Sequence, residues 1–381
     1  MEGLKELDFP IRVLVLITKL DRGGAETMIM NYMRNMDRKK VQYDFLVNRQ
    51  EKGAYEDEIQ SLGGKIYRMC PMYPQYFARY KKEFREFLKE HPEYQIIHSN
   101  LEERSYFPLR IAAEMSVPVR IAHAHSVYKG INTKTVFRNY FRHHLNPYVT
   151  HRFACSQEAG EWLFGKNFYG ETAKIIPNAI DVSKFAFSEK IREQYRAQLH
   201  LEGKNIYGCV ARFSKQKNHI FLLDVFQHIH MRDKNAILLL VGSGGLEKKI
   251  RYQVKKLHLQ DVVMFTGSVS NVYDYLQAMD AFIFPSLCEG LGMVLIEAQA
   301  AGLPCFASLE GIPKAAKVTN RLKFLSLNDS AKDWANQIMQ EHLNQDRASY
   351  AQQVAKAGFD IPTRAKCMED FYIDAYMEAL Q

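Results

Sequence analysis

Two glutamates flank a glycine-rich loop in the second half of the chain. Glu289 precedes Gly290 and Gly292, and Glu297 falls inside the apolar segment 293–301 that follows. The run 281–284 before the loop is typical of a buried strand, and segment 293–301 is rich in good helix formers. A helix that begins after a tight loop offers free N–H groups and a positive dipole end, which suit an anionic ligand. The two carboxylates can then bind different parts of one elongated ligand.

A pair of cations comes earlier, directly after the predicted strand 206–211. Arg212 and Lys217 flank the loop A-R-F-S-K-Q-K-N. A preorganised arginine and lysine can stabilise negative charge on a leaving group without a metal ion. Taken alone, the pair is equally well explained as ordinary surface charge. The loop G-S-G-G, from Gly242 to Gly245, lacks the Gly-Lys-Ser/Thr ending of a P-loop and so does not indicate ATP hydrolysis.

Histidines stand at the ends of two predicted strands in the first half. His98 ends segment 94–98, while His123 and His125 end segment 119–124. Ligands of open α/β sheets bind at the carboxyl ends of strands, so these positions lie at the right edge. A lone histidine is more often a hydrogen-bonded structural residue. We expect a functional role for His125 and leave both interpretations open for His98 and His123.

The chain begins with a predicted strand, 11–17, a turn containing Gly23 and Gly24, and a helix to about residue 36. This is a Rossmann-type opening without G-x-G-x-x-G, which argues against a dinucleotide site. A turn that needs glycine only for its geometry is the alternative interpretation of Gly23 and Gly24.

Taken in their order along the chain, these motifs resemble those of retaining GT-B glycosyltransferases, above all glycosyltransferase family 4. The family carries Glu-x₇-Glu, R-x₄-K, a Gly-Gly loop, a cleft histidine and P-N-G-I-D, which here is Pro177 to Asp181 with Ala179 in place of glycine. The resemblance implies an α/β fold of two Rossmann-like domains facing each other across a deep cleft. These would be an acceptor domain at 1–185 and a nucleotide-sugar domain at 186–361. The helix expected at 362–381 would either cross back to the first domain or close the second.

The resemblance also implies a role for each site residue. Glu289 would meet the donor sugar, Glu297 the ribose, and Arg212 and Lys217 the phosphates, with His125 completing the catalytic set. The remaining donor-side positions are Gly242, Ser268, Val269, Gly290, Gly292, Met293 and Val294, and the cleft and acceptor positions are Gly23, Gly24, His98 and His123.

The implied activity is retaining transfer of a hexose or N-acetylhexosamine from a nucleotide sugar, with UDP favoured, to a lipid-linked saccharide. No convincing carboxylate nucleophile is present, so a front-face substitution is expected. No D-x-D metal motif follows a strand, so we expect no metal and no cofactor besides the donor. Segment 311–327 is similar to that of capsular and exopolysaccharide glycosyltransferases. A nucleotide-sugar 2-epimerase and a non-catalytic sugar-nucleotide sensor on the same fold are the alternatives.

Composition limits the class of protein. The chain has 381 residues, 47% hydrophobic and 25% charged, which suits two or three globular domains. A net charge of +8 favours an anionic partner. No apolar run approaches the roughly 20 residues of a membrane span, and the first ten residues lack a signal-peptide core. We therefore expect a cytoplasmic protein, attached at most peripherally to the inner face of the plasma membrane, with its six cysteines as buried free thiols.

The segment 120–152 contains no acidic residue. It interleaves cations with aromatic residues: Arg120, Lys129, Lys134, Arg138, Arg142 and Arg152 with Tyr128, Phe137, Tyr140, Phe141 and Tyr148. This pattern suits an anionic membrane surface or an acceptor with a lipid diphosphate, and a solvated basic face is the plain alternative. Nucleic acid is disfavoured, because no helix-turn-helix, zinc-finger or RNP-type pattern is present.

Overall fold

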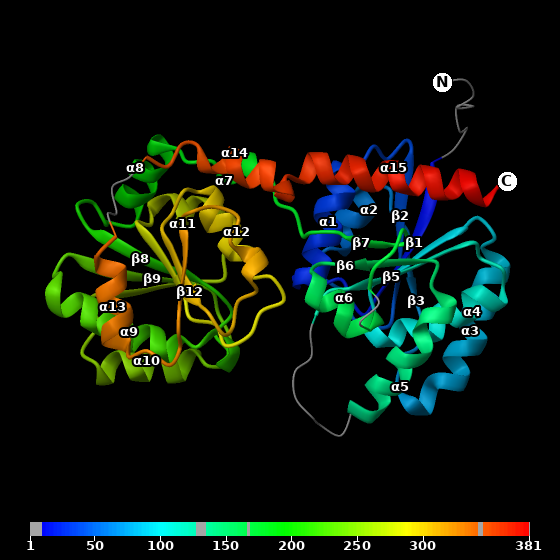
Figure 1. Ribbon diagram of the computed structural model, residues 1–381, viewed down its shortest axis with the longest axis horizontal. Helices are drawn as coiled ribbons and strands as arrows, with labels where there is room; N and C mark the ends of the chain where they lie inside the picture. Colours follow the sequence, from blue (N-terminus) through cyan, green and yellow to red (C-terminus); the bar gives the residue numbers. More distant parts are fainter. Residues whose placement is uncertain (1–9, 127–134, 166–167, 342–345, 381) are drawn as a thin grey trace. The chain divides into compact units, whose positions relative to one another are not determined.

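A computed structural model describes residues 10–126, 135–165, 168–341 and 346–380 (Figure 1). The chain forms two compact units. The first joins Met1–Ala179 to Ile361–Gln381, and the second is Ile180–Asp360. The chain thus leaves the first unit shortly before residue 185, where the sequence placed the domain boundary. Each unit is an α/β body built on a parallel sheet, which agrees with the predicted fold class.

The first unit contains a sheet with the strand order β3-β2-β1-β4-β5-β6-β7 among its described residues. Strand β1 reads I-R-V-L-V-L-I and is almost wholly buried, because a parallel sheet is covered on both faces. The chain continues from β1 to β2 on one side, and β4 then pairs on the other, so a topological switch point lies beside β1. The strands are β1 (Ile11–Ile17), β2 (Val41–Val47), β3 (Ile66–Arg68), β4 (Ile96–Ser99), β5 (Val119–Ala124), β6 (His151–Ala154) and β7 (Ala173–Ile175).

Helices cover this sheet with two separate hydrophobic cores. Helices α1 (Gly24–Asn35) and α15 (Ile361–Ala379) share one core. The final helix therefore packs on the first unit, through residues such as Met368 and Tyr372 (Figure 1). The other core lies beneath α3 (Phe77–Glu90), α4 (Tyr106–Glu114), α5 (Thr135–Leu145) and α6 (Gln157–Phe164). The short helix α2 (Glu56–Ser61) follows β2.

The second unit repeats the design around one core. Its described strands lie in the order β10-β9-β8-β11-β12-β13, with the switch point between β8 and β11. The strands are β8 (Asn205–Val210), β9 (Ala236–Val241), β10 (Val263–Gly267), β11 (Ala281–Phe284), β12 (Cys305–Ser308) and β13 (Leu322–Leu325). The helices are α7 (Val182–Phe185), α8 (Glu189–Gln198), α9 (His219–Arg232), α10 (Glu247–Lys256), α11 (Val272–Ala278), α12 (Met293–Ala300), α13 (Ala331–Met339) and α14 (Tyr350–Val354).

The cysteines are free, as expected, but the prediction that all are buried is wrong for two of them. Cys288 is half-buried and Cys367 is exposed. Cys367 lies on α15, a helix that buries only the side facing the sheet, so a residue on its other side meets solvent. Within the described residues, none of the helices has the length and apolar character needed to cross a membrane.

Candidate active site

The carboxyl edge of the second sheet brings two predicted motifs together. Strands β8 and β11 are paired, so the loops that follow them leave the sheet side by side. Hydrogen bonds join these loops: Leu287 N donates to Gln216 O at 2.7 Å, and Ser286 Oγ donates to the same oxygen at 3.0 Å. In this way the switch point places the cation motif next to the first glutamate.

Lys217 and Glu289 form an ion pair at this junction. Lys217 Nζ lies 2.6 Å from Glu289 Oε1, and the two side chains are 19% and 10% exposed. The Ser286 hydroxyl also contacts this carboxylate oxygen, so its single proton is shared between Glu289 Oε1 and Gln216 O. Lys217 Nζ also lies 4.9 Å from the ring centroid of Phe284, a contact that favours a cation. The pair is therefore oriented before any ligand arrives.

Arg212 behaves differently from its predicted partner. Its residue is exposed, and its side chain forms no hydrogen bond or ion pair with the residues that the structure describes. The structure thus brings Lys217 to Glu289 and leaves Arg212 in solvent, where it can turn toward an incoming anion.

The loop after β11 ends in the N-terminus of α12. Gly292 has φ +80°, a left-handed conformation that glycine adopts without strain, and it is the N-cap residue without a side-chain cap. Leu295 N donates to Gly292 O at 2.8 Å. Met293 and Val294 are the first two residues of the helix, so their N–H groups have no acceptor within it. Both residues are half-buried. This is the geometry expected for binding an anion with the backbone.

Glu297 lies one turn further along α12. Burial raises the pKa of its carboxyl to about 7. Its side chain forms no hydrogen bond or ion pair with any described residue. A desolvated carboxyl without a protein partner is the kind of group that a ligand hydroxyl can satisfy.

The loops after β9 and β10 approach the same edge. Gly242 has φ +138°, and a Cβ atom there would stand 2.1 Å from Ala211 O. This glycine is needed so that the loop after β9 can pass close to the loop after β8. Its amide donates to Gly267 O at 2.8 Å, just before Ser268 and Val269. Ser268 is exposed and Val269 half-buried, which leaves backbone groups available at this edge.

In the first unit, two of the predicted histidines are buried in one hydrogen-bonded chain. His98 Nε2 lies 3.1 Å from His123 Nδ1, and His98 Nδ1 lies 2.7 Å from the Tyr372 hydroxyl on α15. The Tyr372 hydroxyl lies 3.0 Å from that of Tyr43. Burial, and to a smaller degree the neighbouring His125, lower the pKa of His98 to about 3, so its ring is neutral. Both histidines therefore belong to the packing of α15 on the sheet.

His125 lies beyond the end of β5 and is half-buried. Its Nε2 lies 2.7 Å from Asn100 Oδ1, which can only accept, so Nε2 carries the proton and Nδ1 is left as an acceptor. Nδ1 has no hydrogen-bond partner in the described part of the chain. Burial lowers the pKa of His125 to about 4, so the ring is neutral. The ring stacks on that of His123 at 4.1 Å between centroids.

A carboxyl that sequence reasoning missed supports this histidine. Glu102 Oε1 accepts a hydrogen bond from His125 N at 3.0 Å. Glu102 is buried, and burial raises the pKa of its carboxyl to about 8. Its φ of +52° is uncommon for a residue other than glycine. Its place just after β4, at the carboxyl edge of the sheet, is the one signal that could have identified it.

The two glycines at the start of α1, Gly23 and Gly24, are not required by backbone geometry. Gly23 has an extended φ of −108°. A Cβ at Gly24 would meet nothing within 4 Å, and one at Gly23 would meet only the flexible end of Glu26. The turn itself could therefore be built with other residues at Gly24. The open space above it favours the interpretation that this loop leaves room for a ligand.

A polar cavity of about 350 Å³ lies at the ends of β1 and β2 and was not predicted. Its lining residues are Lys19, Asp21, Arg49, Glu51, Lys52 and Gly53. A tyrosine adjoins it: Arg49 Nη1 donates to the Tyr73 hydroxyl at 2.7 Å, and Tyr73 is 42% exposed. Only its position at a carboxyl edge could have marked it in the sequence.

The basic aromatic segment is only partly a surface. Tyr128, Lys129 and Lys134 lie outside the described residues. Four arginines are occupied by intramolecular contacts: Arg120 with Tyr148 O at 2.9 Å, Arg138 with Glu103 at 3.4 Å, Arg142 over the Trp162 ring at 4.6 Å, and Arg152 with Thr172 Oγ1 at 3.0 Å. Phe141 packs against the core, whereas Val136, Phe137 and Tyr140 on α5 are 75%, 60% and 52% exposed. Helix α5 thus exposes apolar and aromatic side chains in its first half, beside the exposed polar residues Asn139, His143 and His144.

No group of three or more His, Cys, Asp or Glu side chains that could hold a metal ion occurs among the described residues. At the donor-side positions, the Glu289 carboxylate is paired to Lys217.

Comparisons with known proteins identify the family of the chain. Residues 22–184 match the family described as Glycosyltransferase Family 4, and residues 191–358 match Glycosyl transferases group 1. The chain is 34% identical over 332 residues to the glycosyltransferase EpsF of Bacillus subtilis (strain 168), covering 86% of each chain. It is 26% identical over 234 residues to the UDP-Gal:alpha-D-GlcNAc-diphosphoundecaprenol alpha-1,3-galactosyltransferase of Escherichia coli, covering 59% of this chain and 60% of that protein.

Among solved structures, the fold is similar to that of Anabaena HepE in complex with UDP and glucose. The TM-score is 0.76 at 20% identity, over 95% of this chain and 99% of that chain. This similarity concerns the fold.

Proposed function

This chain belongs to the glycosyltransferase family that joins a family 4 domain to a group 1 domain in a GT-B fold, and from this premise we propose that it is a retaining hexosyltransferase. We propose a UDP-linked hexose or N-acetylhexosamine as the donor and a lipid-linked saccharide as the acceptor. The proposed setting is the synthesis of exopolysaccharide, capsule or another cell-surface glycan, at the cytoplasmic face of the membrane.

The observation that carries the donor site is the Lys217–Glu289 pair beside the start of α12. A cation at 2.6 Å holds the Glu289 carboxylate in place, and the free N–H groups of Met293 and Val294 lie a few residues further on. Glu289 would bind the donor sugar hydroxyls, while Lys217, Arg212 and these N–H groups would bind the diphosphate. The partnerless carboxyl of Glu297 would accept hydrogen bonds from the ribose diol.

The proposed reaction is a front-face substitution. The bond between the anomeric carbon and the diphosphate oxygen breaks, and its electron pair leaves with the UDP. The acceptor hydroxyl oxygen bonds to the same face of the anomeric carbon, and its proton passes to the leaving phosphate. Lys217 and Arg212 would stabilise the charge that develops on the diphosphate, so we propose that no metal ion is required.

The acceptor would be bound by the first unit, in the polar cavity at the ends of β1 and β2. Its cations Lys19, Arg49 and Lys52 suit a phosphate, and its carboxylates Asp21 and Glu51 suit sugar hydroxyls. The relative from E. coli is named for an acceptor with a diphosphoundecaprenol group, which supports this class of acceptor.

The test is a donor screen with an acceptor that contains both expected parts. Purified protein is incubated with each UDP- and GDP-sugar and an alkyl-diphosphate-linked N-acetylhexosamine, and the product is read by mass and its new anomeric linkage by NMR. We expect one donor to be transferred with its anomeric configuration kept. An inverted product would overturn the retaining mechanism, and a donor isomerised without acceptor would indicate a 2-epimerase. Absence of both transfer and UDP binding would overturn the proposed donor site.

A further inference from the structure

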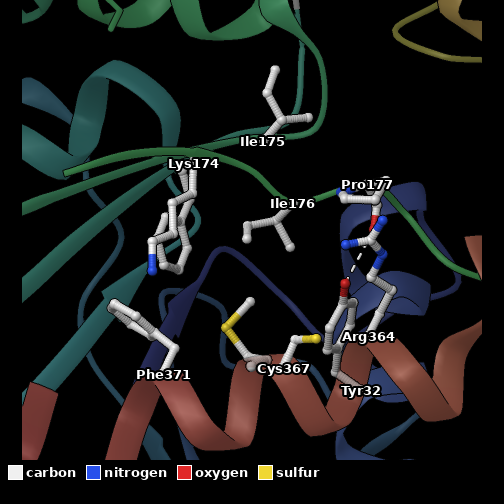
Figure 2. Close-up of a pocket in the computed structure, with 10 residues that line it drawn as sticks. Tyr32, Lys174, Ile175, Ile176, Pro177, Arg364, Cys367 and Phe371 are labelled. Atoms are coloured by element: carbon white, nitrogen blue, oxygen red, sulfur yellow. Dashed lines mark hydrogen bonds between the residues drawn. The ribbon is translucent and has the colours of Figure 1, made fainter. Parts of the chain in front are cut away.

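A cavity of about 340 Å³ opens beside α15, and all its lining residues belong to the first unit. It shares no lining residue with the cavity at the ends of β1 and β2, because it is built from α1, β6, β7, the chain after β7 and α15. Its inner surface is partly polar and partly apolar, with two cations at its sides (Figure 2). The apolar lining includes Phe153, Ile176, Met368 and Phe371.

The two cations stand on opposite sides of this cavity. Figure 2 shows Lys174 above Phe371 on one side, Arg364 beside Pro177 on the other, and Cys367 between them on α15. Lys174 Nζ lies 4.7 Å from the Phe371 ring centroid, so the ammonium group is held at the edge of an aromatic surface. The described residues that line the cavity include neither aspartate nor glutamate. This lining is complementary to an anion that carries an apolar or aromatic part.

The cavity touches the segment through which the chain leaves the first unit. This segment, 177–179, is tied to α1 by two hydrogen bonds: Tyr32 OH donates to Pro177 O at 3.1 Å, and Asn31 Nδ2 donates to Ala179 O at 3.3 Å. Tyr32 and Pro177 both line the cavity. Helix α1 then runs from this end back to Gly24, where the Gly-Gly loop begins it. A molecule in the cavity would therefore contact one end of a rigid element whose other end is at the candidate acceptor loop.

We propose that this cavity is a second binding site, for a small amphipathic anion, and that its occupancy is transmitted through α1 to the Gly-Gly loop. The ligand class is a phosphate or carboxylate joined to an apolar or aromatic group. The Arg364 guanidinium binds the anionic group, the Lys174 ammonium attracts it from the opposite side of the cavity, and Phe371, Ile176 and Met368 bury the apolar part. The volume falls within the range of small-molecule sites, about 300–1,000 Å³. Such chemistry occurs both in free phosphorylated metabolites and in anionic lipids.

Cys367 reports occupancy directly, because it is an exposed thiol that lines the cavity. The experiment measures the rate at which N-ethylmaleimide alkylates Cys367, by peptide mass spectrometry, with and without 1-naphthyl phosphate. Glutathione alkylated in the same mixture is the internal reference. We expect a ligand at ten times its Kd to slow Cys367 alkylation roughly tenfold and to leave glutathione alkylation unchanged. Inorganic phosphate and 1-naphthol, each offering one half of the ligand, should protect much less.

Charge variants separate this site from non-specific binding. Arg364→Gln should lose most of the protection and Lys174→Gln part of it, measured as the ratio of rates with and without ligand in the same variant. Lys89→Gln, which removes an exposed cation from α3 in the same unit, should keep it. Equal protection in Arg364→Gln and wild type would overturn the site. The site would also be overturned if neither naphthyl phosphate nor phosphatidylglycerol vesicles protected Cys367. Protection by the vesicles alone, not matched by phosphatidylcholine, would identify a lipid as the source of the anion.

Transmission through α1 is tested by hydrogen–deuterium exchange of the full-length protein. Naphthyl phosphate should change exchange over residues 20–26 in wild type and not in Arg364→Gln. Unchanged exchange in wild type at a concentration that protects Cys367 would overturn transmission while leaving the binding site in place. Neither measurement uses a donor or an acceptor. A failure of the second binding site is therefore distinguishable from a failure of the proposed transferase activity.

Discussion

Lys217 Nζ lies 2.6 Å from Glu289 Oε1, although seventy-two residues of chain separate these two side chains. The contact exists because β8 and β11 are neighbours in the sheet, so that their following loops meet at one edge. The two charges are mostly withdrawn from solvent, which strengthens their attraction and restricts the rotamers of both. The carboxylate that we assign to the donor sugar is thus positioned by the cation that we assign to the phosphates.

Replacing Lys217 by alanine should lower transfer about 100-fold or more, because a preorganised charge at the leaving group is lost. Glu289 would also lose its partner, so we expect weaker donor binding. Steady-state rates with the donor found in the screen would measure both effects. Lys215→Ala, an exposed lysine in the same short turn, is the matched control and should remain near wild type. Equal activity of the two variants would contradict the role given to Lys217.

The affinity for UDP should increase as pH rises from 6 to 8. The pKa of Glu297 is raised to about 7, and only its ionised form accepts two hydrogen bonds from the ribose diol. The Kd should fall roughly tenfold across this range by linkage. Titration calorimetry would measure the pH dependence of the Kd for UDP in wild type and in Glu297→Gln. Ionisation of UDP affects both proteins equally, so the difference between their pH profiles is the contribution of Glu297. Identical pH profiles would remove Glu297 from the site.

The same raised pKa has the opposite effect on stability. Between the ordinary value of 4.5 and about 7, the folded protein keeps a proton on Glu297 that the unfolded chain has lost. The contribution of this group to the free energy of unfolding should therefore decline as pH rises through that window. Denaturant unfolding at several pH values would show a weaker decline for Glu297→Gln than for wild type.

Tyr372→Phe should reduce the free energy of unfolding by about 1–3 kcal/mol, because it leaves buried His98 Nδ1 and the Tyr43 hydroxyl without their shared partner. Urea denaturation measures the loss. Tyr376→Phe is the control, since this residue lies on the same helix, packs on the same core and is only half-buried. A loss no larger than that of the control would show that the buried chain of hydroxyls and histidines contributes nothing to stability.

Binding to lipid vesicles should depend on the exposed face of α5. Phe137→Ser combined with Tyr140→Ser should reduce flotation with phosphatidylglycerol vesicles severalfold, because both aromatic rings are exposed and can enter the interface. The four arginines of this segment are already engaged, so added salt should weaken the binding only modestly. Binding that is abolished by salt and unchanged in the double variant would assign it to charge elsewhere.

Transfer should continue in the presence of EDTA. The proposed site stabilises the leaving diphosphate with Lys217, Arg212 and backbone N–H groups, which a chelator does not remove. The measurement compares rates in EDTA with rates in added Mg²⁺ or Mn²⁺. A rate that vanishes in EDTA and returns with one of these ions would overturn metal independence.

The sequence by itself determined the class of fold and the donor-side motifs. Continuous apolar runs such as 11–17 and 236–241 alternate with helical segments, and only a covered parallel sheet buries such strands on both faces. The motifs around Arg212 and Glu289 are local in the chain, so their spacing could be recognised directly. For the same reason the start of α12 could be predicted from glycines and helix formers alone.

The tertiary structure decided which of these residues meet. Local sequence cannot show that Lys217 pairs with Glu289 while Arg212 stays in solvent, because strand order sets that contact. It cannot show that His98 joins Tyr372 from the end of the chain, or that Glu102 supports His125, because both contacts depend on packing. The cavity lined by Lys174 and Arg364 likewise arises only when α15 packs on the first unit, which brings together side chains from distant parts of the chain.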